Sequence, residues 1–284
     1  MAVHEVAGVS YHVDNKLVKL WGKNSIEKMQ SSNSDRVYIV DGRERIGKTT
    51  FAIQQMGFLD EKAFKDKKTF LSRICFTPDD FNRAVRETKN GVIIFDEAFR
   101  GLSSRSALSK VNKSIIQTLM EMGQNNNIVF IVLPTIFLLD IYPAMLRSDG
   151  LFHITQDKKN PKKRVWNGFS RDDKNQIFKT GIKKGWKYTK STLFKGRFFK
   201  KIPYEKEYLE KKAKALKMMI ETPTDTEIES RYKHQRDIMI QIFKDECNMA
   251  YRELERQLNA RGVALTNGQM CNIVRELAKK PLNA

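Results

Sequence analysis

The 284-residue chain has few of the residues that build disulfide or zinc frameworks. It holds three cysteines, widely spaced and without a Cys-x-x-Cys pair, and its four histidines are scattered. Neither a disulfide framework nor a zinc site is therefore predicted. No run approaches the roughly 18 apolar residues of a membrane-spanning helix, and the N-terminus lacks the basic-then-apolar pattern of a secretion signal. We expect a cytoplasmic protein that reaches a membrane only through a partner.

Acidic residues are also in short supply. The chain has 33 Asp and Glu against 52 Lys and Arg, which gives a formal net charge of +19. Such an excess is typical of proteins that bind polyanions, because Lys and Arg release the counterions condensed on nucleic acid. A solvated basic surface is the alternative, and a thermophile's enrichment in Lys would bring Glu with it. We therefore expect DNA as a partner, and we find no acidic cluster of the kind that forms a nuclease.

The chain is organised around a glycine-rich loop. Residues 42–50 match the phosphate-binding template Gly-x4-Gly-Lys-[Ser/Thr] at every fixed position. Residues 36–41 predict a strand before the loop, and residues 50–56 predict a helix after it. In this arrangement the backbone N–H groups of the loop cradle phosphate oxygens at a helix N-terminus. The predicted nucleotide-binding residues are Gly42, Arg43, Glu44, Arg45, Ile46, Gly47, Lys48, Thr49 and Thr50.

Two of these residues have predicted chemical roles. Lys48 is expected to reach the β- and γ-phosphates of ATP, and the Thr49 hydroxyl is expected to bind Mg²⁺. A chance match in a turn before a helix is the alternative interpretation. The strand and helix predicted on either side of the loop argue against it.

A second motif supports the same chemistry. Residues 91–95 form an apolar run, which predicts a strand buried on both faces of a parallel sheet, and Asp96 and Glu97 follow it. Asp96 is expected to complete the Mg²⁺ shell, and Glu97 to polarise a water for in-line attack on the γ-phosphate. Capping of the next helix is the alternative. A Glu at this place favours hydrolysis over a binding-only switch.

Further strands and helices are predicted between and around these motifs. Strands are expected at residues 69–76, 128–133 and 150–154, and a helix at residues 136–146. Thr77 is predicted to cap a helix that buries Phe81, Ala84 and Val85. In the N-terminal extension, residues 17–21 are expected to pack on the edge of the sheet.

Two residues near the later strand are candidates for the catalytic cycle. Thr135 follows the strand at 128–133, where a polar side chain can contact the attacking water or the γ-phosphate, and an N-cap for the next helix is the alternative. Arg147 closes the helix at 136–146. It either compensates the helix dipole or reaches a neighbouring subunit's γ-phosphate.

The segment after Glu97 is a polar, serine-rich loop that carries basic residues. It is either a plain connector or a loop that touches nucleic acid and responds to hydrolysis. In the second interpretation Arg105 and Lys110 contact DNA.

These elements together carry a family resemblance. A strand and a helix separate the glycine loop from the strand that ends at Asp96, an order typical of P-loop ATPases with an extra strand between the Walker A and Walker B strands. Residues 36–154 resemble the HerA/FtsK group of DNA-pumping ATPases, including type IV secretion coupling proteins and the zonula-occludens-toxin-like ATPases of filamentous phages. The resemblance rests on the glycine loop, on Asp96-Glu97-Ala98, and on the later strand with its polar end followed by a helix and Arg147. Pro134-Thr135 stand where that group usually has a Gln.

The resemblance implies an α/β fold with a RecA-like parallel sheet, and ATP and Mg²⁺ as cofactors. We expect a homo-oligomer, with a hexameric ring as one form. The ATPase core is predicted at residues 36–156, after an N-terminal extension at residues 1–35.

A strongly basic segment follows the core. Residues 157–201 hold sixteen Lys and Arg against three Asp, which is +13 of the total +19, and aromatic residues alternate with them. Four glycines in the segment suggest turns, so we predict β-hairpins with one apolar and one cationic face. Such strands suit a phosphate backbone and stacked bases, whereas the alternative is that the aromatics pack on the core and the lysines are solvated. The predicted DNA contacts here are Lys162, Lys163, Arg164, Lys183, Lys184 and Lys187.

The C-terminal part is predicted to be helical. A charged helix ends the basic extension at residue 221, residues 222–226 form a linker, and residues 227–284 form a small domain. Thr266 and Gln269 form a capping box before the last helix. Helix, glycine-containing turn and capped helix resemble a helix-turn-helix domain, although many small bundles bind only protein. If the domain binds DNA, the residues expected to contact base edges are Asn267, Gln269, Asn272 and Arg275.

The sequence thus predicts an Mg²⁺·ATP-driven motor that moves or remodels DNA for packaging, transfer or replication, encoded by a virus or another mobile element. A DNA-binding regulator or helicase loader switched by ATP is the first alternative. A secretion ATPase is the second, and the lack of a hydrophobic anchor counts against it.

Overall fold

The structure is a computed structural model that describes residues 2–6, 8–23, 26–96, 110–157, 160, 163–221, 225–245, 249–261 and 264–278. The chain divides into two compact units, Met1–Lys217 and Met218–Ala284. The division falls inside α10 (Glu205–Glu221), just before the linker predicted at residues 222–226.

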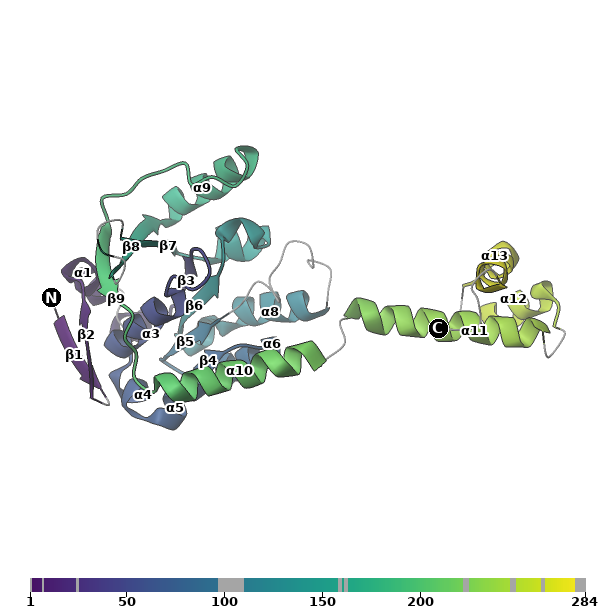
Figure 1. The fold of residues 1–284 in the computed structure, drawn as a ribbon, viewed down its shortest axis with the longest axis horizontal. Coiled ribbons are helices and arrows are strands. Elements are labelled where there is room, and N and C mark those ends of the chain that lie inside the picture. Colours follow the sequence, from purple (N-terminus) through teal and green to yellow (C-terminus); the bar gives the residue numbers. More distant parts are fainter. Residues whose placement is uncertain are drawn as a thin grey trace. The chain divides into compact units, whose positions relative to one another are not determined.

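The first unit is built on a seven-stranded sheet in the order β4-β5-β6-β3-β7-β8-β9 (Figure 1). The strands from β3 to β7 pair in parallel, whereas β8 and β9 are antiparallel. β6 therefore lies between β3 and β5. The strands are β3 (Arg36–Asp41), β4 (Ile74–Cys75), β5 (Val92–Phe95), β6 (Ile128–Leu133), β7 (Gly150–Gln156), β8 (Lys163–Ser170) and β9 (Lys195–Phe199).

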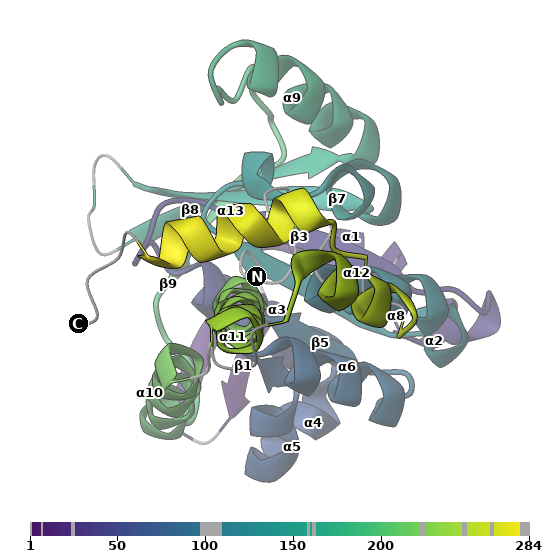
Figure 2. The ribbon, with the colours of Figure 1, turned by 90° about the vertical axis from the view of Figure 1, so that its right-hand side faces the viewer.

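Helices cover both faces of this sheet, which explains why β3, β5 and β6 are almost entirely apolar and buried. One core cluster joins the strands to α6 (Pro78–Glu87), α8 (Lys110–Glu121) and α9 (Arg171–Lys183). Figure 2 shows α9 beside β7 and α6 beside β5. The predicted stripe of Phe81, Ala84 and Val85 is buried, and Thr77 caps α6 by accepting from Asp80 N at 3.1 Å.

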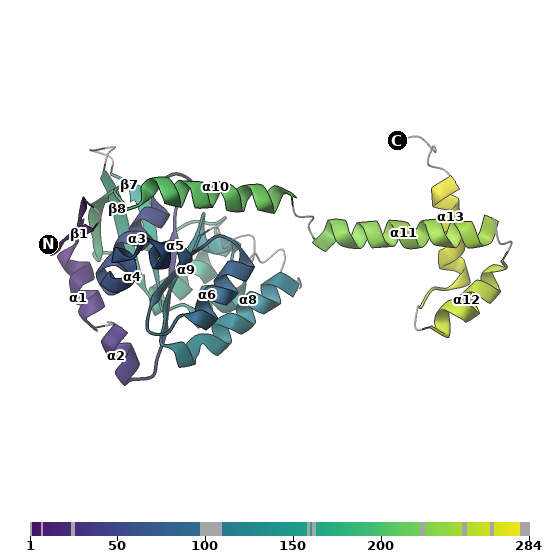
Figure 3. The ribbon, with the colours of Figure 1, turned by 90° about the horizontal axis from the view of Figure 1, so that it is seen from below.

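The other face is covered by α3 (Lys48–Leu59) and α1 (Asn15–Lys23) (Figure 3), and Trp21 Nε1 of α1 donates to Gln55 Oε1 of α3 at 2.9 Å. Trp21 of α1 is fully buried and its ring contacts Tyr38, Phe130 and Phe152 on three neighbouring strands. The expectation that residues 17–21 pack on the sheet edge is therefore wrong. A tryptophan buries more apolar area over the middle of a sheet than beside its last strand.

The strand predicted at residues 69–76 is mostly a helix. Asp66 begins α5 (Lys67–Ser72) by accepting from Thr69 N at 2.8 Å, and only Ile74–Cys75 pair as β4. The preceding α4 (Glu61–Lys65) is capped in the same way by Asp60. These side-chain caps stabilise local helix where a run of apolar and β-branched residues alone favours a strand.

The helix predicted at residues 136–146 is broken into two short turns, η3 (Ile136–Leu138) and η4 (Tyr142–Arg147). Pro143 has no N–H to donate, and the Asp140 side chain accepts from Tyr142 N at 3.1 Å. Both features interrupt an α-helix at this point.

The β-hairpins predicted for the basic segment are wrong for its middle part, where α9 forms. The Ser170 hydroxyl accepts from Asp173 N at 3.2 Å, which starts the helix. Lys174, Ile177, Phe178 and Gly181 are buried at helical spacing. Among the described residues of this segment, only β8 and β9, on either side of α9, are strands.

The remaining elements of the first unit lie at its N-terminus and before β6. They are an antiparallel hairpin of β1 (Ala2–Val6) and β2 (Val9–Val13), α2 (Ile26–Ser31) and η2 (Met122–Asn125). None of the helices in the described ranges has the length and apolar content that a bilayer crossing needs.

The second unit contains α11 (Asp225–Asp245), α12 (Tyr251–Asn259) and α13 (Asn267–Ala278). They enclose a small core of Ile240, Leu254, Leu265 and Met270. The predicted capping box is confirmed, because Thr266 N donates to Gln269 Oε1 at 2.9 Å and Gln269 N donates to Thr266 Oγ1 at 3.3 Å.

Candidate functional site

The glycine loop joins the carboxyl end of β3 to the first turn of α3. Gly42 has φ 141°, and a Cβ added there would lie 2.4 Å from Ile154 O of β7. Gly47 is the N-cap of α3 with φ 98°, and Arg45 between them has φ 57°. Because Gly47 has no side chain with which to cap α3, the first N–H groups of the helix are suited to an anionic ligand.

Lys48 folds back over this loop. Its ammonium donates to Gly42 O at 3.0 Å and to Arg43 O at 2.9 Å. Burial lowers the pKa of Lys48, while the carboxylates of Asp96 and Asp41 act in the opposite direction. The loop carbonyls thus hold a cation at the place where phosphate would bind beside the helix N-terminus.

The two predicted metal ligands lie next to each other. Thr49 Oγ1 donates to Asp96 Oδ2 at 3.0 Å, and Asp96 is 3% exposed at the carboxyl end of β5. Magnesium in nucleotide sites is held by one or two protein oxygens, with phosphate and water completing the shell. Thr49 and Asp96 fit this donor set, and the described residues hold no cluster of three His, Cys, Asp or Glu that would form an all-protein metal site.

The sheet and the loop fit the P-loop NTPase fold. The loop follows the central β3, the acidic residue follows β5, and β6 lies between these strands. Their carboxyl ends therefore meet at one edge of the parallel sheet, where ligands bind in open α/β folds.

Two residues of α10 that the sequence did not indicate also reach this edge. Tyr208 OH donates to Asp96 Oδ2 at 3.2 Å, and Lys212 Nζ lies 3.2 Å from the same oxygen. The sequence shows only a Lys- and Glu-rich helix here. No spacing signal distinguishes the lysine that docks from those that face solvent.

Two cations of the basic segment also hold the loop. Arg164 Nε donates to Ile46 O at 3.0 Å, and Lys200 Nζ donates to Arg45 O at 3.2 Å. A Cβ added to Gly47 would lie 3.2 Å from Lys200 Cγ, so the lysine stem packs across the loop. Both cations bind the outward carbonyls of the loop.

A buried polar network lies beneath the glycine loop, around Asp41. His153 Nδ1 lies 2.8 Å from Asp41 Oδ1, while Ile136 N at 2.9 Å and the Tyr188 hydroxyl donate to Oδ2. Thr135 Oγ1 is 3.2 Å from the Tyr188 hydroxyl, and burial followed by the Asp41 charge raises the pKa of Tyr188. Thr135 stands at the N-cap position of η3, as the alternative predicted, but its side chain makes no cap hydrogen bond there. Its role as a sensor stays a prediction.

Arg147 lies at the amino end of the sheet, opposite to the glycine loop. Its guanidinium forms an ion pair with Asp35, which immediately precedes β3, and its Nε donates to Leu119 O at 2.7 Å. β3 is six residues long, roughly 20 Å at about 3.3 Å per residue. Arg147 therefore does not act on the nucleotide site of its own chain, and its action on a neighbour stays a prediction.

The predicted DNA contacts fall into several groups. Arg105 and Lys162 lie outside the described residues, as does the predicted catalytic residue Glu97, and Lys110 is the first residue of α8. Lys163 is half-buried, with its ammonium 5.5 Å from the centre of the Phe199 ring. The exposed residues are Lys183, Lys184 and Lys187 in the first unit, and Gln269, Asn272 and Arg275 on α13, where Asn267 is half-buried.

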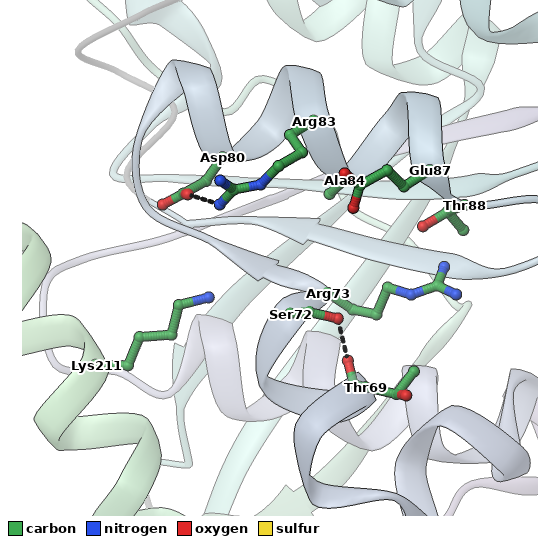
Figure 4. A pocket seen from close by; sticks show the side chains of 9 residues that line it. All are labelled: Thr69, Ser72, Arg73, Asp80, Arg83, Ala84, Glu87, Thr88 and Lys211. Carbon is green, nitrogen blue, oxygen red and sulfur yellow. Dashed lines mark hydrogen bonds and ion pairs between the residues drawn. The ribbon is translucent and has the colours of Figure 1, made fainter.

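A separate cavity of ≈ 230 Å³ is lined by residues of α5, α6 and α10 (Figure 4). Arg73, Arg83 and Lys211 line it together with Asp80 and Glu87, and Arg83 is ion-paired to Asp80. Its charges nearly balance, unlike those around the glycine loop. It therefore gives no support for a second polyphosphate site.

Comparisons with known proteins give only remote similarities. No protein-family profile matches the chain, and no curated protein matches it in sequence. The structure is similar to the N-terminal domain of zonular occludens toxin from Neisseria meningitidis, with TM-score 0.35, 18% identity, and coverage of 48% of this chain and 84% of that one. It is also similar to B204, the DNA-packaging ATPase from Sulfolobus Turreted Icosahedral Virus, with TM-score 0.25, 11% identity, and coverage of 56% and 86%. The nucleotide site is therefore assigned on its own residues.

Proposed function

We propose that this chain is a P-loop ATPase that binds and hydrolyses Mg²⁺·ATP. The observation that carries the proposal is the 3.0 Å contact between Thr49 Oγ1 and Asp96 Oδ2 beside the glycine loop and Lys48. A hydroxyl, a carboxylate and an ammonium meet there at a helix N-terminus, which is the chemistry that a metal-bound polyphosphate requires.

Each residue has a distinct role in this proposal. The loop N–H groups bind phosphate oxygens, and Lys48 exchanges its two loop carbonyls for the β- and γ-phosphates. Thr49 and Asp96 would hold Mg²⁺, which when bound neutralises charge on the phosphates. Glu97, which follows Asp96 in sequence, orients the attacking water and accepts its proton. Thr135 senses the γ-phosphate from the end of β6, and Arg147 acts on a neighbouring subunit's nucleotide.

We further propose that hydrolysis drives movement or remodelling of DNA by a homo-oligomer, with a hexameric ring as one form. The net charge of +19 and the exposed Lys183, Lys184 and Lys187 support a polyanionic partner. An ATPase site together with an exposed basic surface best suits packaging or transfer of DNA for a virus or mobile element.

The test is steady-state ATP hydrolysis with and without double- and single-stranded DNA of random sequence. Stimulation by DNA that is lost in Glu97→Gln and Asp96→Asn supports the motor and identifies its preferred strand form. Slow ATP hydrolysis at a rate that DNA does not change would contradict the motor.

One observation favours a second candidate, an ATP-switched DNA-binding regulator or helicase loader. In the second unit, α13 begins with the reciprocal Thr266–Gln269 cap and exposes Gln269, Asn272 and Arg275. Amide and guanidinium groups on an exposed helix suit base edges in the major groove. This candidate predicts tight binding to one DNA sequence, measured by competition against random DNA.

A further inference from the structure

Two side chains of α10 contact one carboxylate oxygen of the nucleotide site. Asp96 Oδ2 accepts from Thr49 at 3.0 Å and from Tyr208 at 3.2 Å, and Lys212 Nζ lies 3.2 Å from it. Thr49 belongs to the glycine loop side of the site, whereas Tyr208 and Lys212 lie one turn apart on α10. The same oxygen thus links the proposed metal site to a distant helix.

Other contacts position α10 so that Lys212 reaches this oxygen. Lys211 Nζ donates to Leu71 O and Ile74 O, both at 2.6 Å, beside the cavity in Figure 4. Tyr208 packs on the Phe76 ring, with 5.9 Å between centroids, and Lys212 Nζ lies 5.8 Å from the centre of that ring. The ammonium of Lys212 is therefore held between an aromatic face and a buried carboxylate.

Mg²⁺ and Lys212 compete for the same negative charge. A divalent cation at Thr49 and Asp96 would stand beside the Lys212 ammonium in a partly buried place, where like charges repel strongly. The charges of Lys48 and Lys212 already act on each other across the site. A metal ion at this site would therefore weaken the contact between Lys212 and Asp96.

We propose that Lys212 is a positioning residue for Asp96 that acts as a latch: it neutralises the carboxylate in the empty site and withdraws when Mg²⁺·nucleotide binds. Withdrawal removes the Lys212 contact and loosens α10 at this point, while Lys211 keeps its hydrogen bonds to Leu71 O and Ile74 O. The first unit ends at Lys217, and α10 continues past it. Binding of Mg²⁺·nucleotide would therefore alter the helix that leads into the second unit. The latch rests on the proposed nucleotide site.

The first test is an Mg²⁺ titration of binding to a fluorescent, non-hydrolysable ATP analogue, using the full chain. Lys212→Gln is expected to lower the Mg²⁺ concentration for half-maximal binding by about tenfold, because a competing charge is removed. Lys212→Arg keeps the charge and should stay near wild type. Lys214→Gln, an equal charge change at an exposed position of the same helix, is the matched control.

The outcomes separate the latch from the proposed function. A midpoint that is unchanged or raised in Lys212→Gln overturns the latch, and so does weaker binding of the analogue without Mg²⁺, which would make Lys212 a phosphate ligand. If wild type binds no nucleotide, or Lys48→Ala binds it equally well, the proposed function itself fails.

The second test measures hydrogen exchange of the α10 amides, and so stays informative if Lys212→Gln folds poorly. In wild type, Mg²⁺ with the ATP analogue should speed exchange around residues 208–215 severalfold, and Asp96→Asn should show the fast rate without ligand. Ligand-induced slowing of this segment, or a slow rate in Asp96→Asn, contradicts the latch.

Discussion

Two groups of cations in the basic segment have the same charge but different surroundings. Arg164 and Lys200 bind the outward carbonyls of the glycine loop, at Ile46 O and Arg45 O. Lys183, Lys184 and Lys187 are exposed at and after the end of α9. The basic segment is therefore not one surface: some of its cations hydrogen-bond to the glycine loop, and others face solvent without a contact to that loop.

Sheet pairing is the origin of this division. β8 pairs antiparallel with β7, which places Arg164 opposite Gln156 at the carboxyl end of β7, beside the loop. The exposed lysines lie instead at the end of α9 and just after it, beyond the buried stripe by which that helix packs on the sheet.

The largest effect expected within the loop is that of Lys48→Ala. Removing this ammonium should weaken ATP binding by about 3 kcal/mol, roughly 100-fold, because it is the proposed direct phosphate ligand. Isothermal titration with a non-hydrolysable ATP analogue measures the loss, with the exposed Lys62→Ala as control. A loss under threefold contradicts the assignment of the site.

The exposed group is tested by the triple change of Lys183, Lys184 and Lys187 to Gln. If each lysine neutralises one DNA phosphate, the slope of log affinity against log salt should fall by up to about 2.7. Nucleotide affinity should stay unchanged. As a control, the exposed lysines Lys62, Lys68 and Lys89 are changed together to Gln, which removes the same charge elsewhere. An equal fall of the salt slope in this control would contradict a particular role of Lys183, Lys184 and Lys187 in DNA binding.

The loop-binding group is tested by Arg164→Gln, with a smaller expected effect. Losing a charged hydrogen bond to Ile46 O should loosen the loop and weaken nucleotide binding by about 1 kcal/mol, roughly fivefold. Lys163→Gln removes the same charge one residue away, from over the Phe199 ring, and is the matched control. Equal nucleotide affinities of the two variants would show that Arg164 does not support the glycine loop in a way that Lys163 does not.

A third kind of cation in the segment is buried and should affect only stability. Lys174 donates to Met145 O at 3.3 Å and to Asn175 Oδ1 at 2.8 Å, and burial followed by the Arg171 charge lowers its pKa to about 7. Above pH 7 the unfolded chain binds more protons than the folded one, so stability rises with pH by up to about 1.4 kcal/mol per unit until the unfolded pKa is reached.

Urea unfolding of Lys174→Met and wild type at pH 7, 8 and 9 checks this dependence. The wild type should gain stability relative to the variant as pH rises. If the free energies of unfolding of wild type and variant change equally with pH, Lys174 stays protonated in the folded chain.

Local signals in the sequence account for the successful and failed predictions alike. The buried strands β5 and β6, the Thr77 cap and the Thr266–Gln269 box follow the patterns that predicted them. The helix α9 was missed although Ser170 and Asp173 have cap spacing, because alternating aromatics and glycines favoured strands. α5 was missed for the same kind of reason, since the Asp66 cap outweighs strand propensity.

The glycine loop and the carboxylate after β5 could be predicted from the sequence because motif spacing and local backbone preferences encode them, and the excess of positive charge follows from the composition. Three arrangements depend instead on the tertiary fold: Arg164 and Lys200 hold the loop, Tyr208 and Lys212 reach Asp96, and Arg147 lies at the opposite end of β3. These contacts join residues 112 to 155 positions apart, and the order of strands and the docking of α10 bring them together. A charged helix has the same composition whichever face it buries, so no local pattern specifies which lysine meets the carboxylate.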